Sequence, residues 1–174
     1  MEDWSFLFDI GIPFSFLTVL FALIGLICLY FLVVEKDINK TKRQISITFL
    51  VGFVVFVFSS TVIFRPKGQI DNIVLIPLYS YYEAICGNYH LLLENFLNVL
   101  LFVPIGILFY LSQKDKNTTI PILFSMGLSI TIEISQFIWT KGFCEIDDVI
   151  HNTLGCFLGY SLCMIVLNMN LKNS

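Results

Sequence analysis

Residues Glu133–Asn152 read EISQFIWTKGFCEIDDVIHN, and this stretch decides the fold. It places carboxylates, amides and a histidine between two runs that are otherwise apolar enough to cross a bilayer. An ionisable side chain at the centre of a membrane-spanning helix costs at least ~2.5 kcal/mol, so Glu133 requires a polar partner, water or a functional role. The function of the chain is therefore expected in and around this stretch.

The composition is that of an integral membrane protein. Of the 174 residues, 57% are hydrophobic and 13% are charged, and the mean hydropathy is +0.85. A soluble domain is usually about a quarter charged. The net charge of -3, without a basic patch interleaved with aromatic residues, argues against a nucleic-acid partner. The acidic N-terminus, followed by a long apolar run, is unlike a cleaved secretory signal.

The five cysteines show none of the spacings of a metal site, so we expect no metal and no cofactor. Cys28, Cys156 and Cys163 lie inside apolar runs, as small hydrophobic residues do. Cys86 and Cys144 fall in predicted loops, and the sequence leaves a disulfide between them open.

Five apolar segments are long enough to cross about 30 Å of hydrocarbon as α-helices. They are roughly Ile12–Val34, Ile45–Phe64, Leu91–Leu111, Ile120–Trp139 and Val149–Leu167. We therefore expect an all-α fold, a polytopic bundle of five transmembrane helices that forms one membrane domain over residues 1–174. The one long loop, from Arg65 to His90, alternates apolar residues, turn formers and tyrosines, and is expected to lie on the membrane surface.

The basic residues set the expected orientation. With the N-terminus outside, the inward-facing loops and C-terminus hold seven of the ten Lys and Arg residues: Lys36, Lys40, Lys42, Arg43, Lys114, Lys116 and Lys172. The outward-facing loops hold the other three: Arg65, Lys67 and Lys141. Because cytoplasmic loops carry the excess of positive charge, we expect the N-terminus outside and the C-terminus inside.

Polar residues gather at the outer ends of the last three predicted spans, where we expect a pocket that opens outward. The candidate residues are Arg65, Glu94, Asn95, Asn98, Glu133, Gln136, Lys141, Asp147, Asp148 and Asn152. Five of them are expected in one hydrogen-bonded cluster: Asn98, Glu133, Gln136, Asp148 and Asn152. Arg65 is expected at the mouth, either as a snorkelling arginine or as an anion clamp.

The last predicted helix carries most of this pattern. Asp147 is expected to be its N-cap. Asp148, Asn152, Gly155 and Gly159 then form one stripe, in which the glycines permit close approach of a neighbouring helix. We expect His151, like His90 earlier in the chain, at the membrane interface rather than in a catalytic site.

At these residues the chain resembles the VanZ-like family. The resemblance covers roughly residues 65–159, with its pieces in the order that the family shows. They are Arg65 closing the second span, Asn72 and Pro77 in NIVLIP, NVLLFVPIG from Asn98 to Gly106, Glu133 and Gln136 in IEISQF, and DDVIHNTLGCFLG from Asp147 to Gly159. Many members have an arginine shortly before the acidic pair, where this chain offers Lys141, which cannot make a bidentate contact.

The resemblance implies a multi-pass protein of the bacterial plasma membrane, and hence of the cell envelope. Through the founding member of the family it also implies antibiotic resistance, namely reduced susceptibility to teicoplanin-type lipoglycopeptides, which bind cell-wall precursors. It implies no firmly assigned reaction.

Three functions remain open, and we favour the first. In the first, the protein is not an enzyme, and its pocket engages a membrane lipid, a lipid-linked cell-wall precursor or a lipoglycopeptide. In the second, an intramembrane enzyme acts on a lipid head group, with Glu133 or Asp148 as general base. Arg65 or Lys141 would then hold the phosphate. In the third, Glu133 titrates in a proton-coupled carrier, for which a homodimer would supply the missing repeat.

Overall fold

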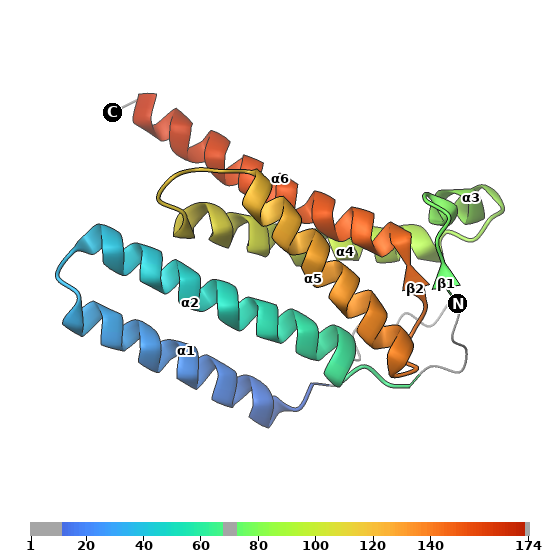
Figure 1. Cartoon of the computed structure of the whole chain (residues 1–174), viewed down its shortest axis with the longest axis horizontal. Helices are drawn as coiled ribbons and strands as arrows, with labels where there is room; N and C mark the ends of the chain where they lie inside the picture. Colours follow the sequence, from blue (N-terminus) through green and yellow to red (C-terminus); the bar gives the residue numbers. More distant parts are fainter. Residues whose placement is uncertain (1–11, 68–72, 173–174) are drawn as a thin grey trace.

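A computed structural model describes residues 12–67 and 73–172, and its architecture is all-α. Five helices are long and apolar enough to cross a membrane, as predicted. They are α1 (Phe14–Val34), α2 (Ile38–Phe58), α4 (His90–Ser112), α5 (Thr119–Ile138) and α6 (Ile146–Lys172), which form the bundle in Figure 1.

The second span begins earlier than the predicted Ile45. Helix α2 starts at Ile38, because the Asp37 side chain accepts hydrogen bonds from the backbone N–H groups of Asn39 and Lys40. The basic residues after Asp37 therefore lie in the first turns of α2 and not in a solvated loop. At its other end α2 continues into a π-helical turn, Ser59–Ile63.

The closest helix packing joins α4 to α6. A Cβ atom at Gly155 would lie 2.2 Å from the backbone oxygen of Val99, and one at Gly159 would lie 2.0 Å from that of Val103. These distances leave no room for a side chain, which confirms the predicted close approach at the glycine stripe. The buried core around this contact consists of Leu50, Val57, Val62, Phe102, Ile105, Ile132 and Cys156.

Helix α1 is peripheral. It packs along α2, and Ile24 is its buried residue. The Ile24 side chain fills the space above Gly52, where a Cβ atom would lie 2.3 Å from it. Most of α1 therefore presents apolar side chains outward, as a helix facing lipid would.

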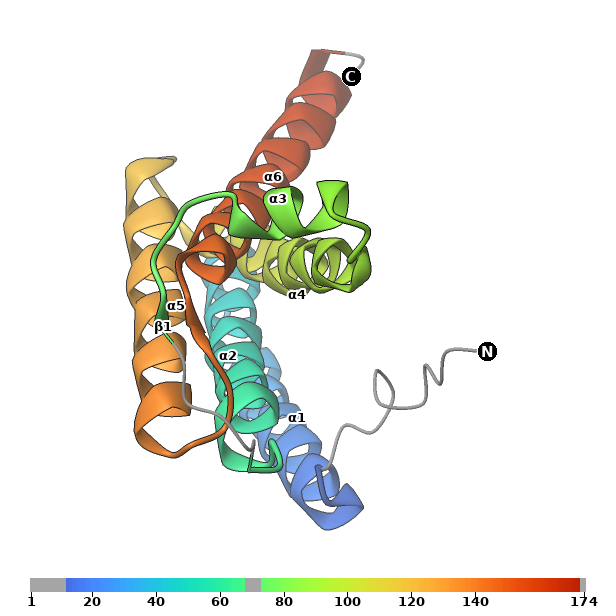
Figure 2. The same ribbon diagram turned by 90° about the vertical axis from the view of Figure 1, so that its right-hand side faces the viewer.

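The predicted surface loop contains structure that the sequence did not suggest. Strand β1 (Ile73–Val74) pairs in parallel with β2 (Cys144–Glu145), and a short helix, α3 (Tyr79–Ile85), follows it. Figure 2, which looks at this end of the molecule, shows α3 beside the ends of α4 and α6. We call this the α3 end of the bundle. All five cysteines are free, including Cys86 and Cys144, so the structure contains no disulfide between them.

Candidate ligand-binding site

The α3 end is held together by the carboxylate of Asp147. Its Oδ1 accepts a hydrogen bond from the backbone N–H of Leu78 at 2.5 Å, and its Oδ2 accepts from the backbone N–H and the hydroxyl of Ser80 at 2.9 and 2.5 Å. Asp147 lies in the first turn of α6, so it does not cap its own helix as predicted. It instead caps α3, from 69 residues away in sequence.

A second layer of hydrogen bonds fixes this contact. The Asn95 side-chain amide donates to the Ser80 hydroxyl at 2.6 Å, which ties α4 to α3. His151 Nδ1 lies 2.6 Å from the carbonyl oxygen of Asp147, and Nε2 lies 2.9 Å from the hydroxyl of Tyr81. Because a carbonyl only accepts, Nδ1 carries the hydrogen and Nε2 accepts from the tyrosine. The His151 side chain is buried within the protein at this end of α6.

The backbone of this segment is itself unusual. Leu78, the residue before α3, has φ of 64° in the left-handed region, which costs free energy for a residue with a side chain. The Leu78 N–H points to Asp147 in this conformation. The carboxylate therefore holds a strained turn in place.

Glu133 supports the same end from α5. Its Oε2 accepts a hydrogen bond from the backbone N–H of Glu145 at 2.9 Å, and only 3% of the residue is exposed. Glu145 belongs to β2, whose partner strand β1 leads to α3. Glu133 is thus a buried support behind the two-stranded sheet and does not lie on an open surface.

Gln136 and Lys141 cap the π-helical turn. The Gln136 amide donates to the carbonyl oxygen of Thr61 at 3.0 Å, and Lys141 Nζ donates to that of Ile63 at 2.6 Å. These carbonyls lie at a helix C-terminus, where they lack partners within the helix. Arg65 is exposed beside them, and a Cβ atom at Gly142 would lie 3.3 Å from its guanidinium carbon.

The other candidates lie close by but have separate partners. The Asn152 amide donates to the Ser129 hydroxyl at 2.8 Å, and Glu94 Oε1 lies 3.2 Å from His90 Nδ1. Asn98 and Asp148 are partly buried. The sequence placed these side chains at one end of the bundle, and the structure does so too.

Among the described residues, the structure shows no direct hydrogen bond between the five side chains of the predicted cluster. Glu133 and Gln136 reach backbone groups, and Asn152 reaches a serine, so the structure divides the cluster into separate contacts. The physical reason is the supply of unpaired backbone groups at nearby helix and strand ends, which buried side chains must satisfy. Asn72, which the family resemblance also singled out, lies outside the described residues.

A cavity of about 250 Å³ opens beside this framework. It is lined by Val74, Tyr79, Glu83, Asn88, Leu91, Phe143 and Glu145. Burial raises the pKa of Glu145, and the nearby carboxylates of Glu94 and Asp147 raise it further, while Arg65 opposes them. A hydrogen bond to Glu83 raises the pKa of Tyr79. Two carboxyl groups and no Lys or Arg side chain are among these lining residues, so the cavity offers hydrogen-bond acceptors without a basic partner in its lining.

The site residues that the sequence did not reveal are Ser80, Tyr81, Glu83, Glu145 and His151. One signal was available for His151, because it follows Asp147 by four residues and so shares its helix face. The residues of α3 gave none, since the partners of Ser80 and Tyr81 on α6 are more than 60 residues away. Across residues 12–67 and 73–172, no group of three or more His, Cys, Asp or Glu side chains is arranged to hold a metal ion.

The chain is similar to a known protein family and to one of its named proteins. The family model for VanZ/LLP1 matches residues 16–167. The chain is 40% identical over 76 residues to Protein VanZ of Enterococcus faecium, an alignment that covers 44% of this chain and 45% of that protein. The aligned part is thus less than half of the relative. No solved structure matches.

Proposed function

Because the chain belongs to the VanZ/LLP1 family, we propose that it is a multi-pass protein of the bacterial cell membrane that lowers susceptibility to teicoplanin-type lipoglycopeptides. It would do so without catalysis, by engaging an amphiphile at the α3 end. The amphiphile is a membrane lipid, a lipid-linked cell-wall precursor or the lipoglycopeptide itself.

The observation that carries this proposal is a polar cavity next to an exposed apolar surface. Around the cavity of Tyr79 and Glu145, the segment from β1 to the end of α3 exposes Leu75, Ile76, Tyr82 and Ile85. Ile85 alone is 86% exposed. An amphiphile has the matching chemistry, since its apolar part would lie along this surface and its polar part would enter the cavity.

The residues that line the cavity determine which polar groups of a ligand can bind there. Glu83 and Glu145 offer carboxylates, and Asn88 and Tyr79 add further polar groups. The polar part of a ligand that enters the cavity would donate N–H or O–H groups to these acceptors. The strained turn at Leu78, held by Asp147, keeps the wall of the cavity in place before any ligand arrives.

The experiment is a susceptibility measurement in a teicoplanin-sensitive bacterium that expresses the chain. We expect the wild-type protein to raise the inhibitory concentration of teicoplanin more than that of a glycopeptide without an acyl tail. Glu145→Gln should abolish the effect at unchanged expression. Asp115→Asn, a matched carboxylate-to-amide change in the loop after α4 at the other end of the bundle, should preserve it. A wild-type protein that changes neither inhibitory concentration refutes the proposal.

A further inference from the structure

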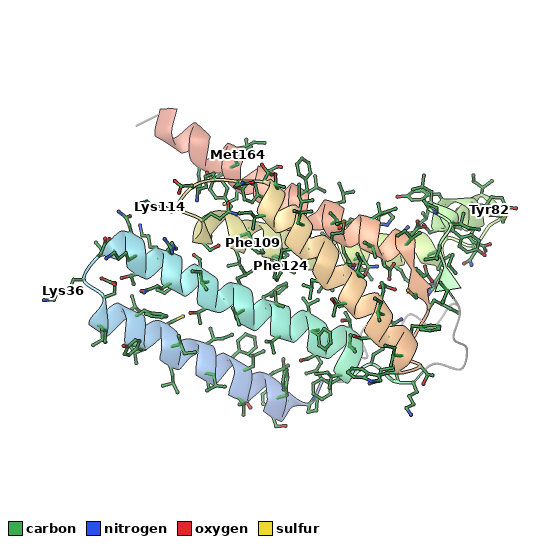
Figure 3. All side chains as sticks on the ribbon, viewed as in Figure 1. Lys36, Tyr82, Phe109, Lys114, Phe124 and Met164 are labelled. Carbon is green, nitrogen blue, oxygen red and sulfur yellow. The ribbon has the colours of Figure 1, made fainter. Side chains whose placement is uncertain are left out.

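A second cavity lies at the opposite end of the bundle, where α1 turns into α2 and α4 ends. Its volume is about 390 Å³. It is lined by Asp37, Asn39, Lys40, Arg43, Leu111, Gln113 and Lys114. We call it the basic groove. Figure 3 labels Lys36 and Lys114 toward this end of the bundle and Tyr82 of α3 at the other.

Three cations from two separate elements face the basic groove. Lys40 and Arg43 come from the first turns of α2, and Lys114 follows α4. All three are exposed, and none of them forms an ion pair with an Asp or Glu among the residues that the structure describes. The convergence of three like charges is unfavourable unless a ligand or solvent supplies further negative charge.

The one carboxylate in the lining does not neutralise them. Asp37 uses Oδ1 to accept from the backbone N–H groups of Asn39 and Lys40, at 2.9 and 3.3 Å. Three cations and one carboxylate leave the lining with a net charge of about two positive units. Lys116 nearby has a different role, since its Nζ donates to the carbonyl oxygens of Tyr110 and Gln113. Its burial lowers the pKa of its ammonium group.

The position of the groove indicates where the counter-charge comes from. The lining residues stand at the ends of the first, second and third spans, whose helices end at Val34, begin at Ile38 and end at Ser112. Charged residues at the ends of spanning helices lie at the level of lipid head groups. Leu111 adds an exposed apolar wall on the side of the bilayer.

We propose that the basic groove binds the phosphate group of an anionic phospholipid from the adjacent leaflet. Lys40, Arg43 and Lys114 contact the phosphate oxygens, and Leu111 lies against the start of an acyl chain. A lipid fits better than free phosphate because the groove combines cations with this apolar wall at membrane level. The proposal concerns the end opposite the α3 site and stands apart from the function proposed there.

The test is native mass spectrometry of the purified full-length protein with phosphatidylglycerol or phosphatidylcholine. We expect saturable binding of phosphatidylglycerol that Arg43→Gln/Lys114→Gln weakens about tenfold. The matched control Lys36→Gln/Lys42→Gln removes the same charge from the same end, outside the groove lining, and should weaken binding by less than about threefold. The single variant Lys114→Gln should show an intermediate loss, and circular dichroism checks that each variant is folded.

Three results would overturn the proposal. Equal losses in the two double variants would show diffuse surface charge in place of a site. Equal binding of both lipids would show that the negative charge is not recognised. Displacement of bound lipid by inorganic phosphate at millimolar concentration would make free phosphate the ligand.

Discussion

At the scale of single residues, the Asp147 side chain joins α6 to the segment that begins α3. Its carboxylate takes three hydrogen bonds from Leu78 and Ser80, and both it and Ser80 are buried. Asp147→Ala leaves these donors without a partner, at roughly 1–3 kcal/mol for each buried donor. We expect residues 73–85 to exchange amide hydrogens faster, while α5 exchanges as before. Unchanged exchange in residues 73–85 would contradict the role given to Asp147.

The Glu145 carboxyl makes the stability of the fold depend on pH. Burial raises the pKa of its carboxyl above the ordinary 4.5 in the folded state. The folded state then binds the proton more tightly than the unfolded state, so this group favours folding below pH 4.5 and that contribution is lost as the pH rises through the raised value. Glu145→Gln removes this loss. We expect the melting temperature of the variant, measured in detergent, to increase relative to that of the wild type as the pH rises from about 4 to about 7.

A melting-temperature difference that stays constant over that range would show that Glu145 titrates normally. The amide variant keeps the backbone N–H that donates to Glu133, so this hydrogen bond is the same in both proteins.

At the scale of elements, the contact between α4 and α6 depends on having no side chain at Gly159. An added Cβ atom would lie 2.0 Å from the backbone oxygen of Val103, and backbone cannot move aside as a side chain can. We expect Gly159→Ala to lower stability by roughly 1–3 kcal/mol, measured by thermal denaturation in detergent. Gly127→Ala on α5 is the control, because no atom lies within 4 Å of its added Cβ. Equal effects of the two substitutions would refute close packing at Gly159.

The elements that could be predicted from sequence are those with a long apolar run. Each of the five spans was found, since about twenty apolar residues have few other stable arrangements. The start of α2 was misplaced, because its first turns carry Lys40 and Arg43 and so lack the apolar signal. The β1–β2 pair and α3 were not foreseen, since two-residue strands that pair across 71 positions leave no local pattern.

The same limit applies to the candidate site. The sequence located its end of the bundle, because helix periodicity places Glu133 and Gln136 on one buried face. It did not give the partners of these side chains. Gln136 bonds to the carbonyl of Thr61 and Glu133 to the N–H of Glu145, and which backbone groups lack partners depends on how distant segments end. The hydrogen-bond partners of side chains that contact distant segments can therefore be identified only from the three-dimensional structure.

At the scale of the whole molecule, the basic groove and the α3 end lie at opposite ends of the helices (Figure 3). The excess of basic residues predicts that the α3 end faces outside. In intact cells, we expect a membrane-impermeant maleimide to modify the exposed Cys86. A cysteine introduced by Lys40→Cys, in a background with Cys86→Ser and Cys144→Ser, should react only after the membrane is permeabilised. The reverse pattern would contradict the predicted orientation.

We propose that the α3 end binds an amphiphile in the cavity bounded by Glu145. The most direct measurement is a binding titration of the full-length protein in nanodiscs, with teicoplanin and a lipid-linked cell-wall precursor as separate probes. We expect saturable binding of at least one probe. Glu145→Gln should weaken that binding about tenfold, or ~1.4 kcal/mol, and Asp115→Asn should leave it unchanged. Binding of neither probe, or equal losses in the two variants, would show that this cavity is not the binding site.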